Sequence, residues 1–178
     1  MLIRGDARFL PLADGCVDCV VTSPPYFGLR NYGCDGQVGL EPTGAHYVGV
    51  LVSVFREVRR VMRDTATCWV NLGDSYNAYN GGAGPGSRLS KTQTEQRPRL
   101  VTGFGLNDKA LKPKDLMMIP ARVALALQAD GWYLRSDIIW SKPNPMPESV
   151  QDRPTKAHEY LFLLTKSERY FYDAAAIA

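Results

Sequence analysis

A four-residue motif, Ser23-Pro24-Pro25-Tyr26, combines groups that can bind and orient a planar ligand. It follows the apolar run Val17–Thr22, which predicts a buried β-strand. Because neither proline can donate a ladder hydrogen bond, the chain must leave the sheet at Ser23. Ligands of open α/β sheets bind at the carboxyl ends of the strands. The motif therefore puts a hydroxyl, a rigid corner and an aromatic ring where chemistry is expected, although most segments of this kind are turns or linkers.

Four further segments place polar or aromatic residues beside expected strand ends. They are Gly5-Asp6, Leu72–Tyr76, Trp140–Pro147 and His158-Glu159. The Asp6 carboxylate could accept hydrogen bonds from an adenine amine or a ribose hydroxyl, or it could simply cap the turn that follows it.

Four cysteines occur, at positions 16, 19, 34 and 68, and the first two form a Cys-x-x-Cys pair. This spacing could indicate zinc or redox chemistry. However, the chain has no second such pair, and its two histidines, His46 and His158, are far apart in sequence. We therefore predict no metal site and interpret the cysteines as core residues.

The order of these motifs resembles the β-class amino-group DNA methyltransferases. Their catalytic motif is (Asp/Asn/Ser)-Pro-Pro-(Tyr/Phe/Trp), and their catalytic half precedes the cofactor-binding half. The resemblance runs over nearly the whole chain and implies a Rossmann-like α/β fold, S-adenosyl-L-methionine as cofactor and double-stranded DNA as partner. It also implies that Asp6 and Ser23 contact the cofactor. Trp140 and the Lys142–Pro147 loop, with Lys142 and Asn144, would complete the base pocket.

The chemistry implied by this resemblance is methyl transfer to an exocyclic amine of a base. Such an amine is a poor nucleophile because its lone pair is delocalised into the ring. The Ser23 hydroxyl and a main-chain carbonyl of the Pro24-Pro25 corner could accept its two hydrogens and favour a tetrahedral nitrogen. Tyr26 offers a ring on which a base flipped out of the duplex could stack. The transfer requires neither a metal nor a covalent enzyme intermediate.

Serine at the first motif position resembles the cytosine-N4 enzymes more than the adenine-N6 enzymes. Because the Trp140–Pro147 and His158-Glu159 segments also occur in adenine enzymes, an adenine-N6 methyltransferase is the alternative. An alternative of a different kind is a catalytically inactive protein that binds DNA but not the cofactor.

One family feature is absent from the sequence. The β-class enzymes carry a Phe-x-Gly-x-Gly segment that forms most of the methionine pocket, and no such segment occurs here; Gly103-Phe104-Gly105 lies in a basic stretch. We therefore expect an incomplete fold that lacks the central cofactor-binding strands. A complementary carboxy-terminal half or a second subunit would be its partner.

The periodicity predicts alternating strands and helices that position these motifs. After a short strand ending at Gly5, strands are expected at 17–22, 67–72, 132–140 and 160–165, with helices at 46–62 and 116–128 and a turn at 64–66. We expect Ile138 and Ile139 to be buried and residues 169–172 to add a short extended segment. The last two strands are joined by a short loop, which indicates an antiparallel pair at one edge of the sheet. Residues 1–178 are expected to form a single catalytic domain, with a basic, glycine-rich insertion at 77–115.

Composition is typical of a globular protein, with 45% hydrophobic and 22% charged residues among 178. No apolar run reaches the roughly 18 residues of a membrane span, and no leader opens the chain, so we expect a cytoplasmic protein without membrane contact. The net charge is only +3. Residues 87–114, however, contain seven basic side chains and only two acidic ones. The basic residues are Arg88, Lys91, Arg97, Arg99, Lys109, Lys112 and Lys114, and the acidic residues are Glu95 and Asp108. We interpret Arg97, Arg99, Lys112 and Lys114 as candidate phosphate contacts, the alternative being an ordinary solvated loop.

Overall fold

The structure, a computed structural model, describes residues 2–77, 108–145, 147–148 and 150–177. In this part of the chain a four-stranded mixed sheet has the order β1-β2-β4-β3. Its strands are β1 (Val17–Thr22), β2 (Met62–Leu72), β3 (Tyr133–Ser141) and β4 (His158–Thr165). The helices are α1 (Gly44–Val61) and α2 (Ile119–Ala129), and a short 3-10 turn spans Ala175–Ile177. None of the helices described is long and apolar enough to cross a membrane.

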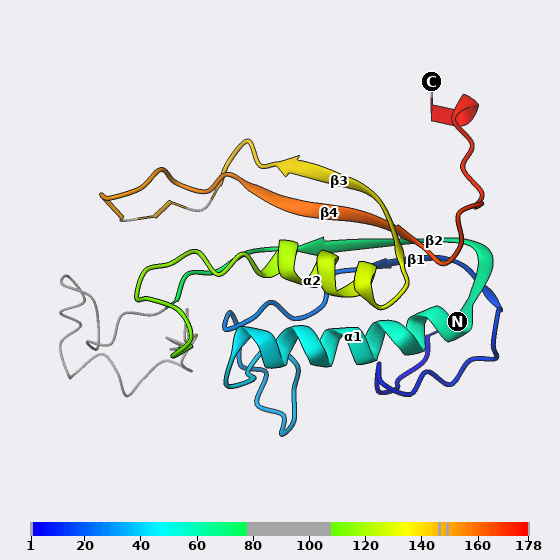
Figure 1. Cartoon of the computed structure of the whole chain (residues 1–178), viewed down its shortest axis with the longest axis horizontal. Coiled ribbons are helices and arrows are strands. Elements are labelled where there is room, and N and C mark those ends of the chain that lie inside the picture. Colours follow the sequence, from blue (N-terminus) through cyan, green and yellow to red (C-terminus); the bar gives the residue numbers. More distant parts are fainter. Residues whose placement is uncertain (1, 78–107, 146, 149, 178) are drawn as a thin grey trace.

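Strand direction brings several chain segments to one edge of the sheet. β1 and β2 are parallel, β4 runs antiparallel to β2, and β3 runs antiparallel to β4. The carboxyl ends of β1, β2 and β3 and the start of β4 therefore lie together (Figure 1). The antiparallel edge pair predicted from the sequence is confirmed.

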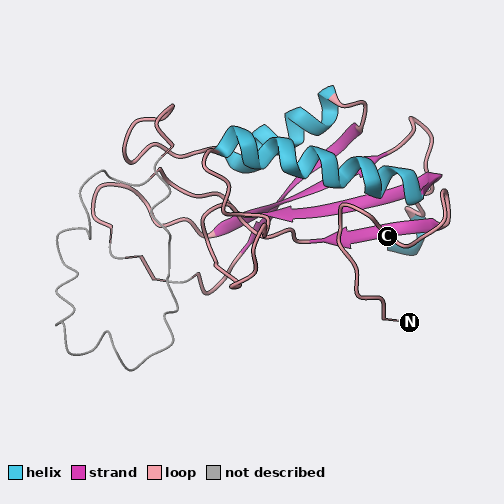
Figure 2. Ribbon diagram, turned by 90° about the horizontal axis from the view of Figure 1, so that it is seen from below, coloured by secondary structure: helices cyan, strands magenta, loops and turns pink. Residues whose placement is uncertain are grey.

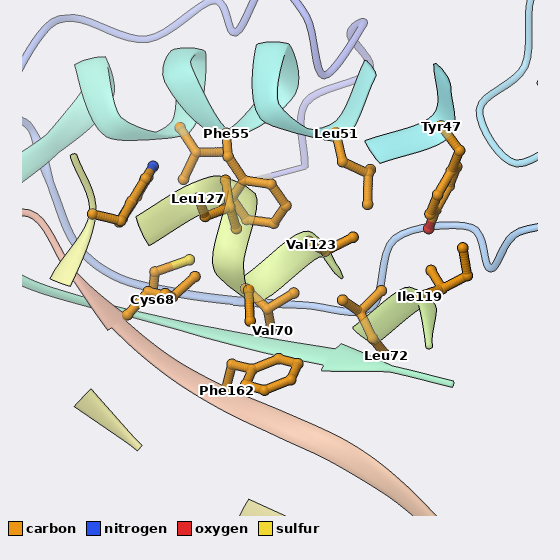
Figure 3. Close-up of a cluster of buried hydrophobic side chains, with 14 of the residues drawn as sticks. Tyr47, Leu51, Phe55, Cys68, Val70, Leu72, Ile119, Val123, Leu127 and Phe162 are labelled. Atoms are coloured by element: carbon orange, nitrogen blue, oxygen red, sulfur yellow. The ribbon is translucent and has the colours of Figure 1, made fainter. Parts of the chain in front are cut away.

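Helices α1 and α2 cover the same face of the sheet, and Figure 2 shows neither of them on the other face. Alternate residues of β2 and β4 point toward the helices and form the core with apolar side chains of α1 and α2 (Figure 3). Tyr47, Leu51 and Phe55 recur at helical spacing on α1 and are at most 1% exposed. Val21 and Trp140 point to the uncovered face and are 76% and 54% exposed.

Several predicted boundaries differ from the structure for local reasons. No turn occurs at 64–66, because β2 begins at Met62 and its polar start pairs with neighbours: Arg63 forms an ion pair with Asp18, and the Phe171 amide donates to the Thr65 carbonyl. Helix α2 begins at Ile119 rather than 116, because Leu116 bridges to Tyr76 and Met118 is left-handed, with φ of 53°.

Some predictions of burial and strand structure are wrong. β1 is an edge strand among the described residues, and β3 is the other edge, so Ile138 and Ile139 are 37% and 55% exposed rather than buried. Residues 2–5 and 169–172 are not strands. Only Cys68 is a core cysteine; the cysteines at 16, 19 and 34 are exposed. The described residues contain no cluster of side chains that could hold a metal.

Asn77 ties together the two ends of the segment that lies outside the described residues. Its amide nitrogen donates to the carbonyls of Asp108, Leu111 and Lys112 at 2.9–3.2 Å, and its Oδ1 accepts from the Asp108 amide. The Asp108 carboxylate in turn accepts from the Gly44 amide at the start of α1. Asn77 and Asp108 are 2% and 3% exposed, so these polar groups have no access to water as a substitute partner.

We predict that Asn77→Ala lowers the free energy of unfolding by about 1–3 kcal/mol, because it removes the Asn77 partner of the Leu111 carbonyl and of the buried Asp108 amide. Urea denaturation measures the change. The control Gln128→Ala removes an exposed amide from α2 and should change the free energy by no more than about 0.5 kcal/mol. A similar small change for both variants would show that the Asn77 contacts do not hold this part of the fold.

Candidate active site

The Ser23–Tyr26 corner lies where the sequence predicts it, directly after β1 at the carboxyl edge of the sheet. The buried Tyr47 hydroxyl of α1 donates a hydrogen bond of 2.8 Å to the Pro25 carbonyl. Phe27 follows the corner and packs on the Tyr47 ring, with 5.3 Å between ring centroids. Burial is the main cause that raises the pKa of Tyr47, so its phenol stays protonated and able to donate. The corner is thus fixed to the core by a side chain of α1.

The Tyr26 ring is held at both its edge and its hydroxyl. The hydroxyl lies 2.6 Å from Asn71 Oδ1 on β2 and 3.1 Å from Glu159 Oε2 on β4. The ring lies against the backbone of Gly73, where an added Cβ would stand 2.6 Å from Tyr26 Cε2. Gly73 is not among the residues with positive φ, so its backbone conformation does not require glycine. The close approach of the ring does.

The Ser23 hydroxyl is only weakly engaged. It lies 3.4 Å from the Tyr26 hydroxyl and 3.4 Å from Asn71 Oδ1, both long for an O–H···O bond. Ser23 is exposed and lines a cavity of about 280 Å³ together with Pro24, Pro25, Tyr26, Leu29, Arg30 and Tyr32. A bound ligand could therefore exchange hydrogen bonds with this hydroxyl.

The Asp74 carboxylate has a structural task in the same region. Its Oδ1 accepts from the amides of Ser75 and Ile119, each at 2.9 Å, so it caps the start of α2, whose own N-cap residue makes no side-chain bond. The side chain is 1% exposed, and the Lys156 ammonium lies 3.7 Å from its other oxygen. The Leu72–Tyr76 motif therefore joins β2 to α2.

The other predicted site residues are Asp6, Trp140, Lys142 and Asn144. Asp6 is exposed and forms an ion pair with Arg8 at 2.7 Å; hydrogen bonds from Arg8 lower the pKa of Asp6 to about 2. Trp140 lies directly opposite Glu159 in the β3–β4 register. Lys142 forms an ion pair with Glu159, and Asn144 is exposed in the loop that follows.

Of the four candidate phosphate contacts, the structure describes Lys112 and Lys114. Lys112 and Lys114 each lie near a carboxylate, Asp115 at 3.8 Å and Asp152 at 2.6 Å. Arg97 and Arg99 lie outside the described residues.

An apolar groove of about 520 Å³ runs along the open edge of β1 between the amino-terminal loop and α1. Its lining includes Ala7, Val21, Ser23, Pro25 and Phe55. Ser23 and Pro25 thus line both this groove and the cavity at the corner. At this groove the corner and Ala7 could contact a cofactor such as S-adenosylmethionine, while the Asp6 carboxylate, next to Ala7 in sequence, is held by Arg8.

Three residues that complete the corner were not predicted as site residues: Asn71, Tyr47 and Glu159. Asn71 is polar within an apolar strand, and it is 9% exposed. A polar residue within an apolar strand can be recognised in the sequence, and it indicates a buried side chain that has hydrogen-bond partners. Tyr47 lies on the apolar stripe of α1, where nothing in the sequence distinguishes its hydroxyl from an ordinary core tyrosine.

We predict that Gly73→Ala destabilises the protein by about 1–3 kcal/mol, because the new methyl group overlaps the Tyr26 ring. In a Tyr26→Ala background the same substitution should cost at least about 1 kcal/mol less, as measured by urea denaturation in a double-mutant cycle. Gly49→Ala is the control, since the site on α1 is open and alanine favours the helix by about 0.5–1 kcal/mol. Equal costs of Gly73→Ala in both backgrounds would contradict the proposed contact.

Comparison with known proteins identifies relatives of this chain. A family model described as DNA methylase, of the N6/N4 type, matches residues 17–178. The chain is 52% identical to the type II methyltransferase M.Cfr9I of Citrobacter freundii over 99% of its own length and 57% of that protein. It is 53% identical to M.XycI of Xanthomonas campestris pv. cyanopsidis, over 97% of this chain and 56% of that protein.

Solved structures show the same fold. The cytosine-N4-specific PvuII DNA methyltransferase matches with a TM-score of 0.61 and 15% identity, over 94% of this chain and 48% of that one. A proposed DNA modification methylase of Thermus thermophilus, solved with S-adenosyl-L-methionine, matches with a TM-score of 0.60 and 21% identity, over 97% of this chain and 55% of that one. The chain thus spans about half the length of these proteins, between 48% and 57% of each. By the match over residues 17–178 and by these sequence relatives, the chain belongs to the N6/N4 DNA methylase family.

Proposed function

We propose that this chain carries the catalytic face of a site-specific DNA methyltransferase, which transfers a methyl group from S-adenosyl-L-methionine to the N4 amine of cytosine in double-stranded DNA. The observation that carries the proposal is the Ser23–Tyr26 corner. Its hydroxyl is weakly engaged, its backbone is fixed from the core, and its ring is already oriented. The type II relatives support a role in restriction–modification.

The corner offers two acceptors for the hydrogens of the target amine. One is the Ser23 hydroxyl. The Pro25 carbonyl is already an acceptor for the Tyr47 hydroxyl, so we assign the second role to the carbonyl of Pro24. Acceptors fixed in advance favour the tetrahedral nitrogen that develops during the reaction, at no cost of reorganisation. When bound, S-adenosyl-L-methionine would supply its sulfonium methyl group: the nitrogen–methyl bond would form as the sulfur–methyl bond breaks, S-adenosyl-L-homocysteine would leave, and the amine would release one proton.

Tyr26 is proposed as the stacking surface for the flipped base. One side of its ring is occupied by Gly73, and the ring lines the cavity at the corner. Trp140 near the end of β3, with Lys142 and Asn144 just after it, is proposed to complete the pocket. Lys112 and Lys114, with Arg97 and Arg99 outside the described residues, are proposed as phosphate contacts.

The serine of the motif favours cytosine over adenine, as in the family resemblance. The alternative is adenine-N6 methylation. Analysis of a DNA digest distinguishes the two reactions, because they produce different methylated nucleosides.

A complementary segment is proposed to complete the cofactor site. Three observations support it: the open edge of β1, the apolar groove along that edge, and relatives whose length is nearly twice the part that matches. The additional segment would extend the sheet beside β1 and supply the second wall of the cofactor pocket, which the described residues do not offer. It is either the remainder of a longer chain or a second polypeptide.

We predict that calorimetric titration of this chain with S-adenosylmethionine shows weak or no binding. Addition of the complementary segment, taken from the region of M.Cfr9I that the chain does not match, should increase the affinity by at least about 100-fold, since a site with both walls buries most of its ligand. Tight binding by the chain alone would show that it needs no such segment.

We predict that Ser23→Ala and Tyr26→Ala affect different steps in the completed enzyme. Ser23→Ala should slow single-turnover formation of N4-methylcytosine by roughly 10²–10³-fold with little change in DNA affinity, because the acceptor acts mainly in the transition state. Tyr26→Ala should weaken capture of the base by roughly 1–3 kcal/mol, whereas Tyr26→Phe keeps the ring and should be mild.

The matched control for these variants is Ser53→Ala, which removes a hydroxyl from the exposed face of α1. It should leave methylation unchanged. If Ser23→Ala and Tyr26→Ala also leave single-turnover methylation unchanged, the corner is only structural and the proposed function is wrong.

A further inference from the structure

Lys142 and Glu159 meet at the carboxyl edge of the sheet, beside the Tyr26 hydroxyl. Lys142 is the first residue after β3 and Glu159 is the second residue of β4, its antiparallel neighbour. The Lys142 ammonium forms an ion pair with Glu159 Oε1. The side chains are 40% and 19% exposed, respectively, so the carboxylate is the more buried partner.

The second oxygen of Glu159 connects this ion pair to Tyr26. Glu159 Oε2 accepts from the Tyr26 hydroxyl at 3.1 Å, and Asn71 Oδ1 lies 2.6 Å from the same hydroxyl. The Asn71 amide nitrogen donates to the Tyr160 carbonyl, which sets the orientation of the amide and aims its oxygen at Tyr26. A phenol has one hydrogen to donate, so two acceptors from two strands compete for it and hold the oxygen between them.

We propose that Lys142 and Glu159 are positioning residues for Tyr26. They hold its ring in the orientation in which it stacks on the target base, and Lys142 contributes to the base pocket through Glu159 rather than by contacting a DNA phosphate. The inference rests on the proposed function of Tyr26, because a positioned ring matters only if the ring captures a base.

The charges of the three groups agree with this arrangement. Burial alone would raise the pKa of Glu159, but hydrogen bonds from Lys142 and Tyr26 outweigh it and lower that pKa, so the carboxylate stays ionised and accepts. Burial, opposed by the contact with Ser23 and assisted by the charge of Glu159, raises the pKa of Tyr26, so the phenol stays a donor. Lys142 therefore helps to lower the pKa of Glu159 and stabilises its carboxylate in a partly buried place.

The chain offers a matched ion pair for comparison. Lys166 lies just beyond the other end of β4, where its ammonium is 2.9 Å from Asp64 and 3.1 Å from the Met62 carbonyl. Lys166→Met removes a lysine from an ion pair beside the same strand, but far from Tyr26 along β4. It should therefore alter neither Tyr26 nor methylation.

The first experiment uses this chain alone and needs no activity. The ring signals of ¹³C-labelled tyrosine are followed by NMR across a pH titration, and Tyr26 is assigned from the signal lost in Tyr26→Phe. Glu159→Gln and Lys142→Met should each change the chemical shift of the Tyr26 ring and its titration. Lys142→Arg, which keeps the positive charge, should leave both as in the unchanged protein, and so should Lys166→Met. An unchanged Tyr26 signal in Glu159→Gln would overturn the inference.

The second experiment uses the enzyme completed with its complementary segment. Glu159→Gln and Lys142→Met should each weaken base capture by about 2- to 10-fold, the scale of one hydrogen bond, with little change in the rate of methyl transfer at saturating DNA. In a Tyr26→Phe background neither variant should have a further effect. The salt dependence of DNA binding should be unchanged in Lys142→Met; a log-log slope reduced by about 0.9 would make Lys142 a phosphate contact and overturn its role here.

The two experiments separate the possible failures. If the Tyr26 signal responds as expected but the completed enzyme does not methylate DNA, the positioning contacts stand and the proposed function fails. If methylation occurs but Glu159→Gln has the same effect with and without the Tyr26 hydroxyl, the positioning role is wrong and the proposed function stands.

Discussion

Two consecutive prolines remove two backbone hydrogen-bond donors at the end of β1, and the rest of the site depends on where this interruption falls. Without donors, Pro24 and Pro25 cannot extend the ladder that joins β1 to β2, so the chain turns away at Ser23. The free corner is then held by the Tyr47 hydroxyl, a side chain of the core. Because the prolines also restrict φ, this hydrogen bond holds a corner whose backbone already has little freedom. The packing of α1 in the core thereby also holds the candidate acceptors in place.

The site is assembled by the sheet topology, because its parts come from distant positions in the chain. Tyr26 follows β1, Asn71 lies near the end of β2, and Glu159 lies near the start of β4, yet all three meet at one hydroxyl. This is possible because β4 is inserted between β2 and β3, which brings the loops before β4 and after β1 to the same edge. Gly73 allows the ring to approach the backbone at this junction. Packing, backbone and hydrogen bonds thus specify one position of the Tyr26 ring.

The described part of the fold is packed on one face only. Helices α1 and α2 cover one side of the sheet, whereas the other side and the free edge of β1 leave apolar side chains such as Val21 exposed. Uncovered apolar surface of this kind is unfavourable in water and is typical of a surface that binds another segment. This asymmetry agrees with the proposal that a complementary segment supplies the second wall of the cofactor pocket.

Local sequence alone determined the existence and type of most elements, together with the corner itself. The apolar period of α1, the Pro120 that is tolerated at the start of α2, and the prolines after β1 act within a few residues, so they could be read without a fold. Burial and partners could not. Ile138, Ile139 and Val21 were expected to be buried because they are apolar, but their strands are sheet edges among the described residues, and edge position is a property of strand order. Likewise, Lys142 and Glu159 are 17 residues apart and both lie far from Tyr26 in sequence. Only the antiparallel pairing of β3 with β4, and of β4 with β2, decides that these side chains meet, because contacts between distant residues depend on register and not on local propensity.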